Sequence, residues 1–147
     1  MRQLGGFLLA GLLLGGCGAD DGERGLAAHD LTVLAPLPGQ EAAVAYLTLV
    51  NDGTTPVEVT AVTSPEFADV QMHETVFGDG VAEMLMIDTL TLAPASTVEF
   101  TEGGRHLMLM QPRVALAPGD DVTLEFHYGT EEPLSVSAPL EPRPGFD

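Results

Sequence analysis

Short apolar runs, rich in Val, Leu and Thr and separated by Gly, Pro, Asp and Asn, fill most of the chain. They have the length and residue types of β-strands, and the breaks between them are typical of turns. No long helical period of apolar residues occurs after residue 17. The predicted strands are residues 43–50, 56–62, 68–77, 81–87, 90–93, 96–101, 106–110, 121–128 and 134–140. Strands at this spacing predict an all-β fold, an antiparallel sandwich or barrel.

The beginning of the chain has a different pattern. Met1 and Arg2 precede a nearly unbroken apolar run that ends at Cys17 and is too short to span a bilayer, so residues 1–16 are predicted to be a secretory signal peptide. The sequence Leu-Gly-Gly-Cys at residues 14–17 resembles a bacterial lipobox, in which the Cys carries the lipid. We therefore expect a periplasmic or otherwise extracytoplasmic lipoprotein anchored through Cys17, the alternative being an ordinary signal peptide. A lipidated Cys17 leaves no thiol for disulfides, thiolate catalysis or thiolate metal sites.

The rest of the chain has the size of one ordinary domain. Residues 17–29 are small, acidic and without period, and are predicted to be a flexible tether that begins at the lipidated Cys17. Residues 141–147 contain Pro142 and Pro144 and are predicted to be an irregular tail. The domain is thus expected at residues 30–140, and we expect it to be a monomer.

Charge excludes one class of partner. The chain has 22 Asp and Glu against five Lys and Arg, a formal net charge of −17. Such a charge repels phosphate backbones, so nucleic acid is not an expected partner. Solubility is the simplest explanation of the acidic surface.

Enzyme activity has little support. His73, Glu74 and Asp79 are close in sequence, but no Ser or Cys nucleophile lies near them. The sequence has neither a phosphate-binding Gly-rich loop nor a Rossmann pattern. We therefore expect a protein that is not an enzyme.

Most of the four His and six Met occur in two short segments, residues 73–84 and 103–110. In the first, residues 77–80 predict a tight hairpin with Gly78 and Asp79 at its centre, which would place His73 directly opposite Met84. In the second, His106 and Met108 alternate with Leu and so share one face of a strand. Two imidazoles and two thioethers are thus predicted to meet. Such a soft, uncharged set suits Cu(I), whereas Zn²⁺ normally takes thiolate or carboxylate beside His.

The spacing of these residues resembles a known signature. His73, ten residues, Met84, twenty-one residues and then His106-Leu107-Met108 match the H-x10-M-x21-H-x-M pattern of the periplasmic copper A chaperone (PCuAC) family. The resemblance covers residues 31–138. It implies a cupredoxin-like, Greek-key β-sandwich that binds Cu(I) at its surface through these four residues. It also implies a copper-accepting partner, such as the copper A centre of a cytochrome oxidase subunit or another copper carrier.

The sequence departs from the family pattern in three places. The Trp- and Arg-containing element that the family often has near the first strand is absent and is replaced by LTVLAPLPG at residues 31–39. Glu102 and Arg105 flank the glycine pair before His106, where Pro and an aromatic residue are usual, so a charged pair is expected at the rim of the site. The His- and Met-rich C-terminal extension of some members is absent, which favours one Cu(I) per chain.

The other His and Met residues have simpler explanations. Met72 neighbours His73 and should face the core, while Met86 and Met110 lie on the ligand faces and are possible auxiliary thioethers. His29 and His127 match no ligand position and are expected to be solvated or structural. Two alternatives stay open: a copper-sequestering resistance protein with the same site, and a β-sandwich lipoprotein that binds a protein partner without metal.

Overall fold

Ten strands build the protein in the computed structural model, which describes residues 25–129 and 132–145. The predicted signal peptide, Cys17 and most of the predicted tether lie outside these residues. Within the part of the chain that the structure describes, no helix is long and apolar enough to cross a membrane. The strands are β1 (Ala27–Leu34), β2 (Ala43–Asn51), β3 (Val57–Thr63), β4 (Phe67–Gly78), β5 (Val81–Ile87), β6 (Leu90–Leu92), β7 (Ser96–Phe100), β8 (Arg105–Pro112), β9 (Asp121–Tyr128) and β10 (Leu134–Glu141). The predicted all-β class is confirmed.

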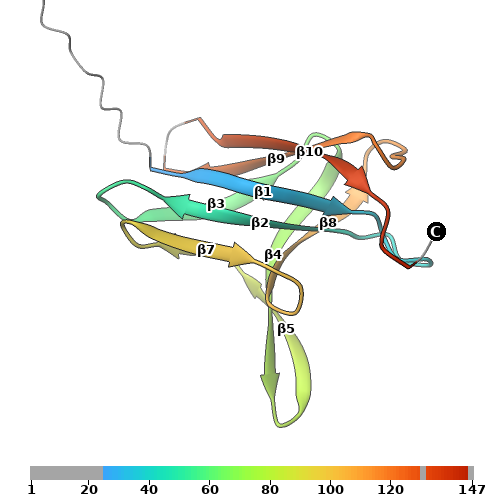
Figure 1. Ribbon diagram of the computed structural model, residues 1–147, viewed down its shortest axis with the longest axis horizontal. Helices are drawn as coiled ribbons and strands as arrows, with labels where there is room; N and C mark the ends of the chain where they lie inside the picture. Colours follow the sequence, from blue (N-terminus) through green and yellow to red (C-terminus); the bar gives the residue numbers. More distant parts are fainter. Residues whose placement is uncertain (1–24, 130–131, 146–147) are drawn as a thin grey trace, which may run out of the picture.

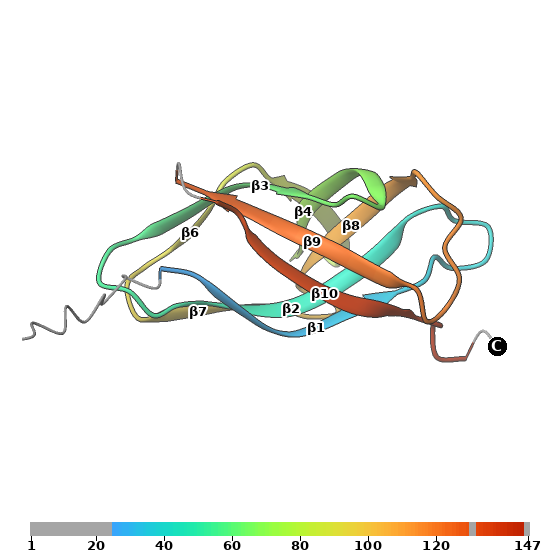
Figure 2. The same ribbon diagram turned by 90° about the horizontal axis from the view of Figure 1, so that it is seen from above.

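The strands form two layers that face each other (Figure 2). One layer has the order β5-β4-β8-β2-β1, with β7 also paired to β2, and the other has the order β10-β9-β3-β6. Pairing between β1 and β10 joins the two layers along one edge. This pair is parallel, whereas the strand pattern predicted an antiparallel sandwich or barrel.

Alternating side chains of both layers make the core. In β9, Val122, Leu124 and Phe126 are fully buried, and the residues between them point outward, as the period of two requires. Leu107 and Leu109 do the same from β8 in the opposite layer. Each such side chain contributes about 1.5–3 kcal/mol relative to an exposed one. This burial fixes the face on which the remaining residues of each strand must lie.

The domain begins earlier than predicted. β1 starts at Ala27, inside the range predicted to be tether, and pairs with β2 from Ala27 opposite Val50 onward. Leu26 is already part of the core. The start of β1 shows no alternation of apolar and polar residues in the sequence, because the strand begins with small residues. It also has a bulge between His29 and Thr32, with Asp30 at a φ of 55°.

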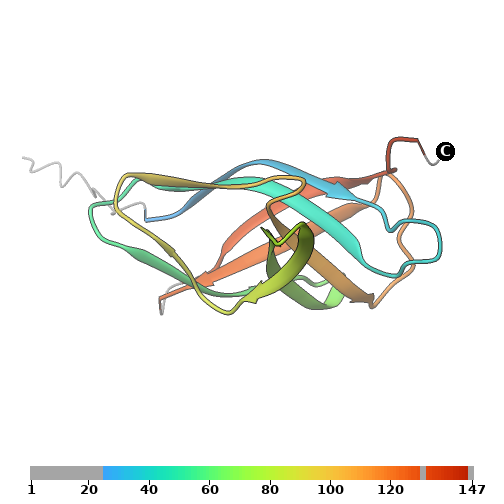
Figure 3. The ribbon, with the colours of Figure 1, turned by 90° about the horizontal axis from the view of Figure 1, so that it is seen from below.

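β4 and β5 extend past the sandwich as a hairpin, called here the arm, which projects from the body in Figure 1 and lies in front of it in Figure 3. Its turn is centred on Asp79 and Gly80, whose φ angles are 50° and 78°. Two positive φ values define a type I′ turn, for which Asp-Gly is a preferred pair. The predicted turn at Gly78 and Asp79 is therefore wrong by one residue.

The shift of the turn changes the predicted register of the arm. His73 lies directly opposite Met86, and Met84 lies opposite Thr75. The predicted direct pairing of His73 with Met84 is thus wrong. Both methionines nevertheless stay on the face of His73, because moving the turn by one residue moves each partner by two positions.

Candidate metal site

Two histidines from different strands meet where the arm leaves the sandwich. His73 of β4 is paired directly with His106 of β8 on one face of the sheet. Their ring centroids are 5.7 Å apart, and the ring planes are inclined by 69°. His106 is buried and His73 is half-buried. The predicted proximity of the two imidazoles is therefore present in the fold.

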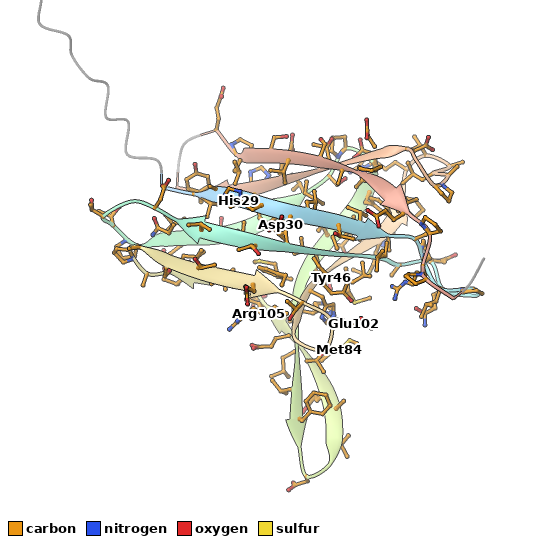
Figure 4. The ribbon with its side chains drawn as sticks, in the orientation of Figure 1. His29, Asp30, Tyr46, Met84, Glu102 and Arg105 are labelled. Carbon is orange, nitrogen blue, oxygen red and sulfur yellow. The ribbon has the colours of Figure 1, made fainter. Side chains whose placement is uncertain are left out.

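Two methionines line the same cavity as His106. Met108 follows His106 on the same face of β8, and Met84 comes from β5 of the arm. Met84, His106 and Met108 line a single cavity of about 270 Å³, together with Tyr46 and Thr75 among others. Met84 is 62% exposed, whereas His106 is 7% exposed. The cavity thus joins a buried imidazole to an exposed thioether, and Figure 4 shows Met84 at the base of the arm.

Met86 and Met110 occupy different surroundings. Met86 is directly opposite His73 but lines a separate cavity of about 170 Å³, together with Val62 and Gln71. Met110 lies opposite Asp69, farther along β8. Met84 therefore shares a cavity with His106 and Met108, although Met86 has the more direct register with His73.

Met72, His127 and His29 were predicted to be buried in the core, solvated or structural, and the fold places each of them in such surroundings. Met72 is 4% exposed and belongs to the core. The Nε2 atom of His127 is 2.7 Å from the Oγ1 atom of Thr63 on the neighbouring strand. His29 is exposed on β1, opposite Thr48.

Each imidazole of the site has one nitrogen in a hydrogen bond. The Nδ1 atom of His106 lies 3.1 Å from the carbonyl oxygen of Gly104, and the Nε2 atom of His73 lies 2.9 Å from the Oε1 atom of Gln71. The Nδ1 atom of His73 is buried and has no hydrogen-bond partner. A metal-binding imidazole normally has this arrangement, with one nitrogen held by a carbonyl or carboxylate and the other free. The residues present thus fit a soft metal ion.

The glycine pair before His106 shapes this part of the site. Gly103 has a φ of 80°, which favours glycine, and it allows the chain to turn into β8. The Gly104 carbonyl that results accepts both the Nδ1–H of His106 and the backbone N–H of Thr75, each at 3.1 Å. His106 is therefore tied to both the turn and the arm.

Burial and charge both act on His73. The pKa of His73 lies below its ordinary value of 6.5, mainly because burial disfavours the charged ring and next because of His106, while Asp69 opposes the shift. A lowered pKa keeps the ring neutral, which is the form that binds metal.

A titration followed by NMR should therefore give His73 a midpoint below 6.5. Replacing His106 with Gln should raise that midpoint without bringing it to 6.5, because desolvation remains. Protons should accordingly compete with metal at His73 only as the pH falls below about 6.5. A His73 midpoint at or above 6.5 in the metal-free protein would contradict this account.

The charged residues around the site differ from the predicted pair. Arg105 contacts Glu74 at 3.5 Å rather than Glu102, and both side chains of that pair are 38% exposed, so the contact contributes at most about 1 kcal/mol. Figure 4 shows Arg105 on one side of the base of the arm and Glu102, Tyr46 and Met84 on the other. The pKa of Tyr46 is raised by burial first and by Glu102 second, while Arg143 opposes the shift.

Sequence reasoning missed Tyr46 and Gln71 as parts of this site. Strand alternation could have placed Gln71 on the face of His73, since the two residues are two positions apart. Tyr46 comes from β2, and no local pattern connects it with β8 or the arm. Among the described residues, no three or more His, Cys, Asp or Glu side chains form a group that could hold a metal. The donors gathered here are imidazole and thioether.

Comparison with solved structures identifies the class of fold. A copper-bound PCuAC domain from PmoF2 has 22% sequence identity and a TM-score of 0.66, with 82% of this chain and 96% of that domain covered. The Cu(I) form of DR1885 from Deinococcus radiodurans has 26% identity and a TM-score of 0.61, with 81% and 78% covered. The chain thus has the fold of PCuAC domains, and the predicted cupredoxin-like β-sandwich is confirmed.

Comparison of sequences identifies the family. Residues 26–140 match the family model described as "Putative lipoprotein LpqE-like", and the chain belongs to this family. It is 35% identical over 89 residues to the "Putative lipoprotein Lxx21020" of Leifsonia xyli subsp. xyli (strain CTCB07), covering 58% of this chain and 54% of that protein. It is 30% identical over 84 residues to the "Uncharacterized protein RP573" of Rickettsia prowazekii (strain Madrid E), covering 56% and 46%. The matches span about half the length of these relatives.

Proposed function

We propose that the protein is an extracytoplasmic Cu(I) carrier that binds one copper ion through His73, Met84, His106 and Met108 and passes it to an accepting protein. The observation that carries the proposal is the direct pairing of His73 with His106, beside a cavity that His106 shares with Met84 and Met108. Two neutral imidazoles and two thioethers favour Cu(I) over harder divalent ions. The copper-bound state of the PmoF2 domain and the Cu(I) state of DR1885 support the same cargo.

The exposure of the four residues suits transfer of copper rather than its permanent storage. His106 is buried and holds the inner side of the site, while Met84 is exposed on the arm. An accepting protein can therefore approach from the side of Met84 and replace this thioether first, while the imidazoles still hold the ion. The acceptor is a copper-binding protein such as a cytochrome oxidase subunit or another copper carrier.

Titration against a Cu(I) chelator tests the proposal. The chain from Gly25 onward should bind one Cu(I), and Met84→Leu should weaken binding by about tenfold, because a soft donor is lost while the volume is kept. Met86→Leu is the matched control from the same face of the arm and should change the affinity by less than about twofold, since Met86 lines a different cavity. Zn²⁺ should compete poorly.

Two results would refute the proposal. Absence of stoichiometric copper would favour a lipoprotein that binds a protein partner through its sandwich. A larger loss for Met86→Leu than for Met84→Leu would show that the register of His73, and not the shared cavity, determines the ligand.

Attachment to a membrane is a further part of the proposal. The lipobox-like residues 14–17 and the lipoprotein relatives support lipidation of Cys17. Cys17→Ser should move the protein from the membrane fraction to the soluble fraction, or leave it unprocessed, while the copper affinity stays unchanged. Identical fractionation of both forms would count against the anchor.

A further inference from the structure

Hydrogen bonds fix which nitrogen of His106 is free. Its Nδ1 atom lies 3.1 Å from the carbonyl oxygen of Gly104. A carbonyl oxygen only accepts, so Nδ1 carries the proton and donates it. The lone pair of His106 is therefore on Nε2.

Three polar residues on one face of β4 form a chain of contacts that ends at His73. Asp69, Gln71 and His73 are two positions apart, so their side chains point the same way. The Nε2 atom of Gln71 donates to the Oδ2 atom of Asp69 at 2.9 Å. This contact orients the amide of Gln71, because a carboxylate accepts and pairs with the amide nitrogen rather than the amide oxygen. The amide oxygen is left facing His73.

The orientation of Gln71 decides the tautomer of His73. The Oε1 atom of Gln71 is 2.9 Å from the Nε2 atom of His73 and can only accept, so Nε2 carries the proton. The lone pair of His73 is then on Nδ1, which is buried without a hydrogen-bond partner. A buried acceptor without a partner costs about 1–3 kcal/mol, and a ligand that binds there removes the cost.

We infer that Gln71, oriented by Asp69, is a positioning residue that fixes the tautomer of His73, so that His73 donates to Cu(I) through Nδ1 while His106 donates through Nε2. The inference rests on the proposed function for the identity of the ligand, but not for the tautomer itself. Gln71 holds the proton on Nε2, so the lone pair of Nδ1 is already available as a donor before copper binds. The Gly104 carbonyl does the same for His106.

Long-range ¹H–¹⁵N NMR spectra of the ¹⁵N-labelled chain test the inference, because they distinguish the two tautomers of each ring. At about pH 8, well above the ordinary pKa of a free imidazole, metal-free His73 should be in the Nε2–H form, and the contact with Gly104 should hold His106 in the Nδ1–H form. Addition of one equivalent of Cu(I) should shift the Nδ1 resonance of His73 and the Nε2 resonance of His106 most strongly.

Two variants separate the role of Gln71 from general support of the fold. Gln71→Leu keeps the volume but removes the acceptor, so His73 should become a mixture of both tautomers and Cu(I) affinity should fall by about tenfold. Gln71→Glu keeps an acceptor oxygen and should retain the Nε2–H tautomer. A side chain that only filled space would leave the tautomer unchanged in both variants.

Each contrary result overturns a different part of the inference or of the proposed function. A His73 in the Nδ1–H form, or a copper shift at its Nε2, overturns the inference and leaves the proposed function standing. Unchanged tautomers in Gln71→Leu remove the role of Gln71. Absence of a copper shift at both histidines overturns the proposed function together with the assignment of the donor nitrogens.

Discussion

His106→Ala and His73→Ala should each weaken Cu(I) binding by more than about 100-fold. Loss of a residue that only supports a metal ligand costs up to about 100-fold in affinity, and loss of the ligand itself should cost more. His106 is the buried inner residue of the site and borders the cavity that Met84 and Met108 share. His73 lies where β4 is paired with both β8 and β5, so its ring has neighbours on both sides. Removal of either ring leaves a single imidazole for the ion.

The controls for this prediction come from the same chain. Met110→Leu changes a thioether on the same face of β8 as His106, but one that lies opposite Asp69. His127→Ala removes an imidazole that contacts Thr63. Both should keep the affinity within about twofold of the unsubstituted protein. Competition with a Cu(I) chelator measures all four variants. If Met110→Leu were as damaging as His106→Ala, the assignment of the four ligands would have to be abandoned.

Asn51→Ala should reduce the free energy of unfolding by about 3 kcal/mol, since one buried and three partly buried backbone groups lose their partner at once. Asn51 at the end of β2 is fully buried. Its Nδ2 atom lies 2.8 Å from the carbonyl oxygen of Thr55, 3.1 Å from that of Leu92 and 3.2 Å from that of Ala93. Its Oδ1 atom accepts the N–H of Gly53 at 3.0 Å. One side chain thus connects the turn after β2 to the end of β6.

Urea denaturation of the metal-free protein measures this effect. Asp52→Asn is the matched control, because Asp52 is the exposed neighbour in the same turn, and it should change the free energy by less than about 0.5 kcal/mol. The folded fraction of Asn51→Ala should bind Cu(I) with unchanged affinity, since Asn51 contacts none of the proposed ligands. A loss below about 1 kcal/mol would show that water replaces these bonds without cost.

Much of the fold could be predicted because buried and outward-facing residues alternate along its strands. The predicted ranges 81–87 and 121–128 coincide with β5 and β9, and the core positions Val122, Leu124 and Phe126 recur with the period of two that burial of one face requires. β1 could not be predicted, since Ala27 and Ala28 give no alternation and a bulge interrupts the strand. The strand is held by backbone pairing with β2 and β10 and by the burial of Val33, and neither pairing can be read from the side chains of β1.

The candidate site could likewise be predicted only in part from the alternation of residues along its strands. Alternation predicted that His106 and Met108 share one face, because this depends only on the strand period. The position of the arm beside them depends on the pairing of β4 with β8, which the sequence indicated only through the spacing that resembles the family signature. The register of the arm was missed because Gly78-Asp79 and Asp79-Gly80 are both plausible turn centres, and only the positive φ of Asp79 and Gly80 decides between them. The contact of Gln71 with His73 depends on the orientation of an amide, which no sequence pattern encodes.

X-ray absorption spectroscopy of the Cu(I)-loaded protein tests the central claim most directly, because it counts the nitrogen and sulfur neighbours of the metal. We expect two nitrogen and two sulfur neighbours at one copper ion per chain, and the double variant Met84→Leu with Met108→Leu should lose both sulfur neighbours while Met86→Leu with Met110→Leu keeps them. A first coordination shell of nitrogen and oxygen alone in the unsubstituted protein, or sulfur neighbours that survive the loss of Met84 and Met108, would contradict the account.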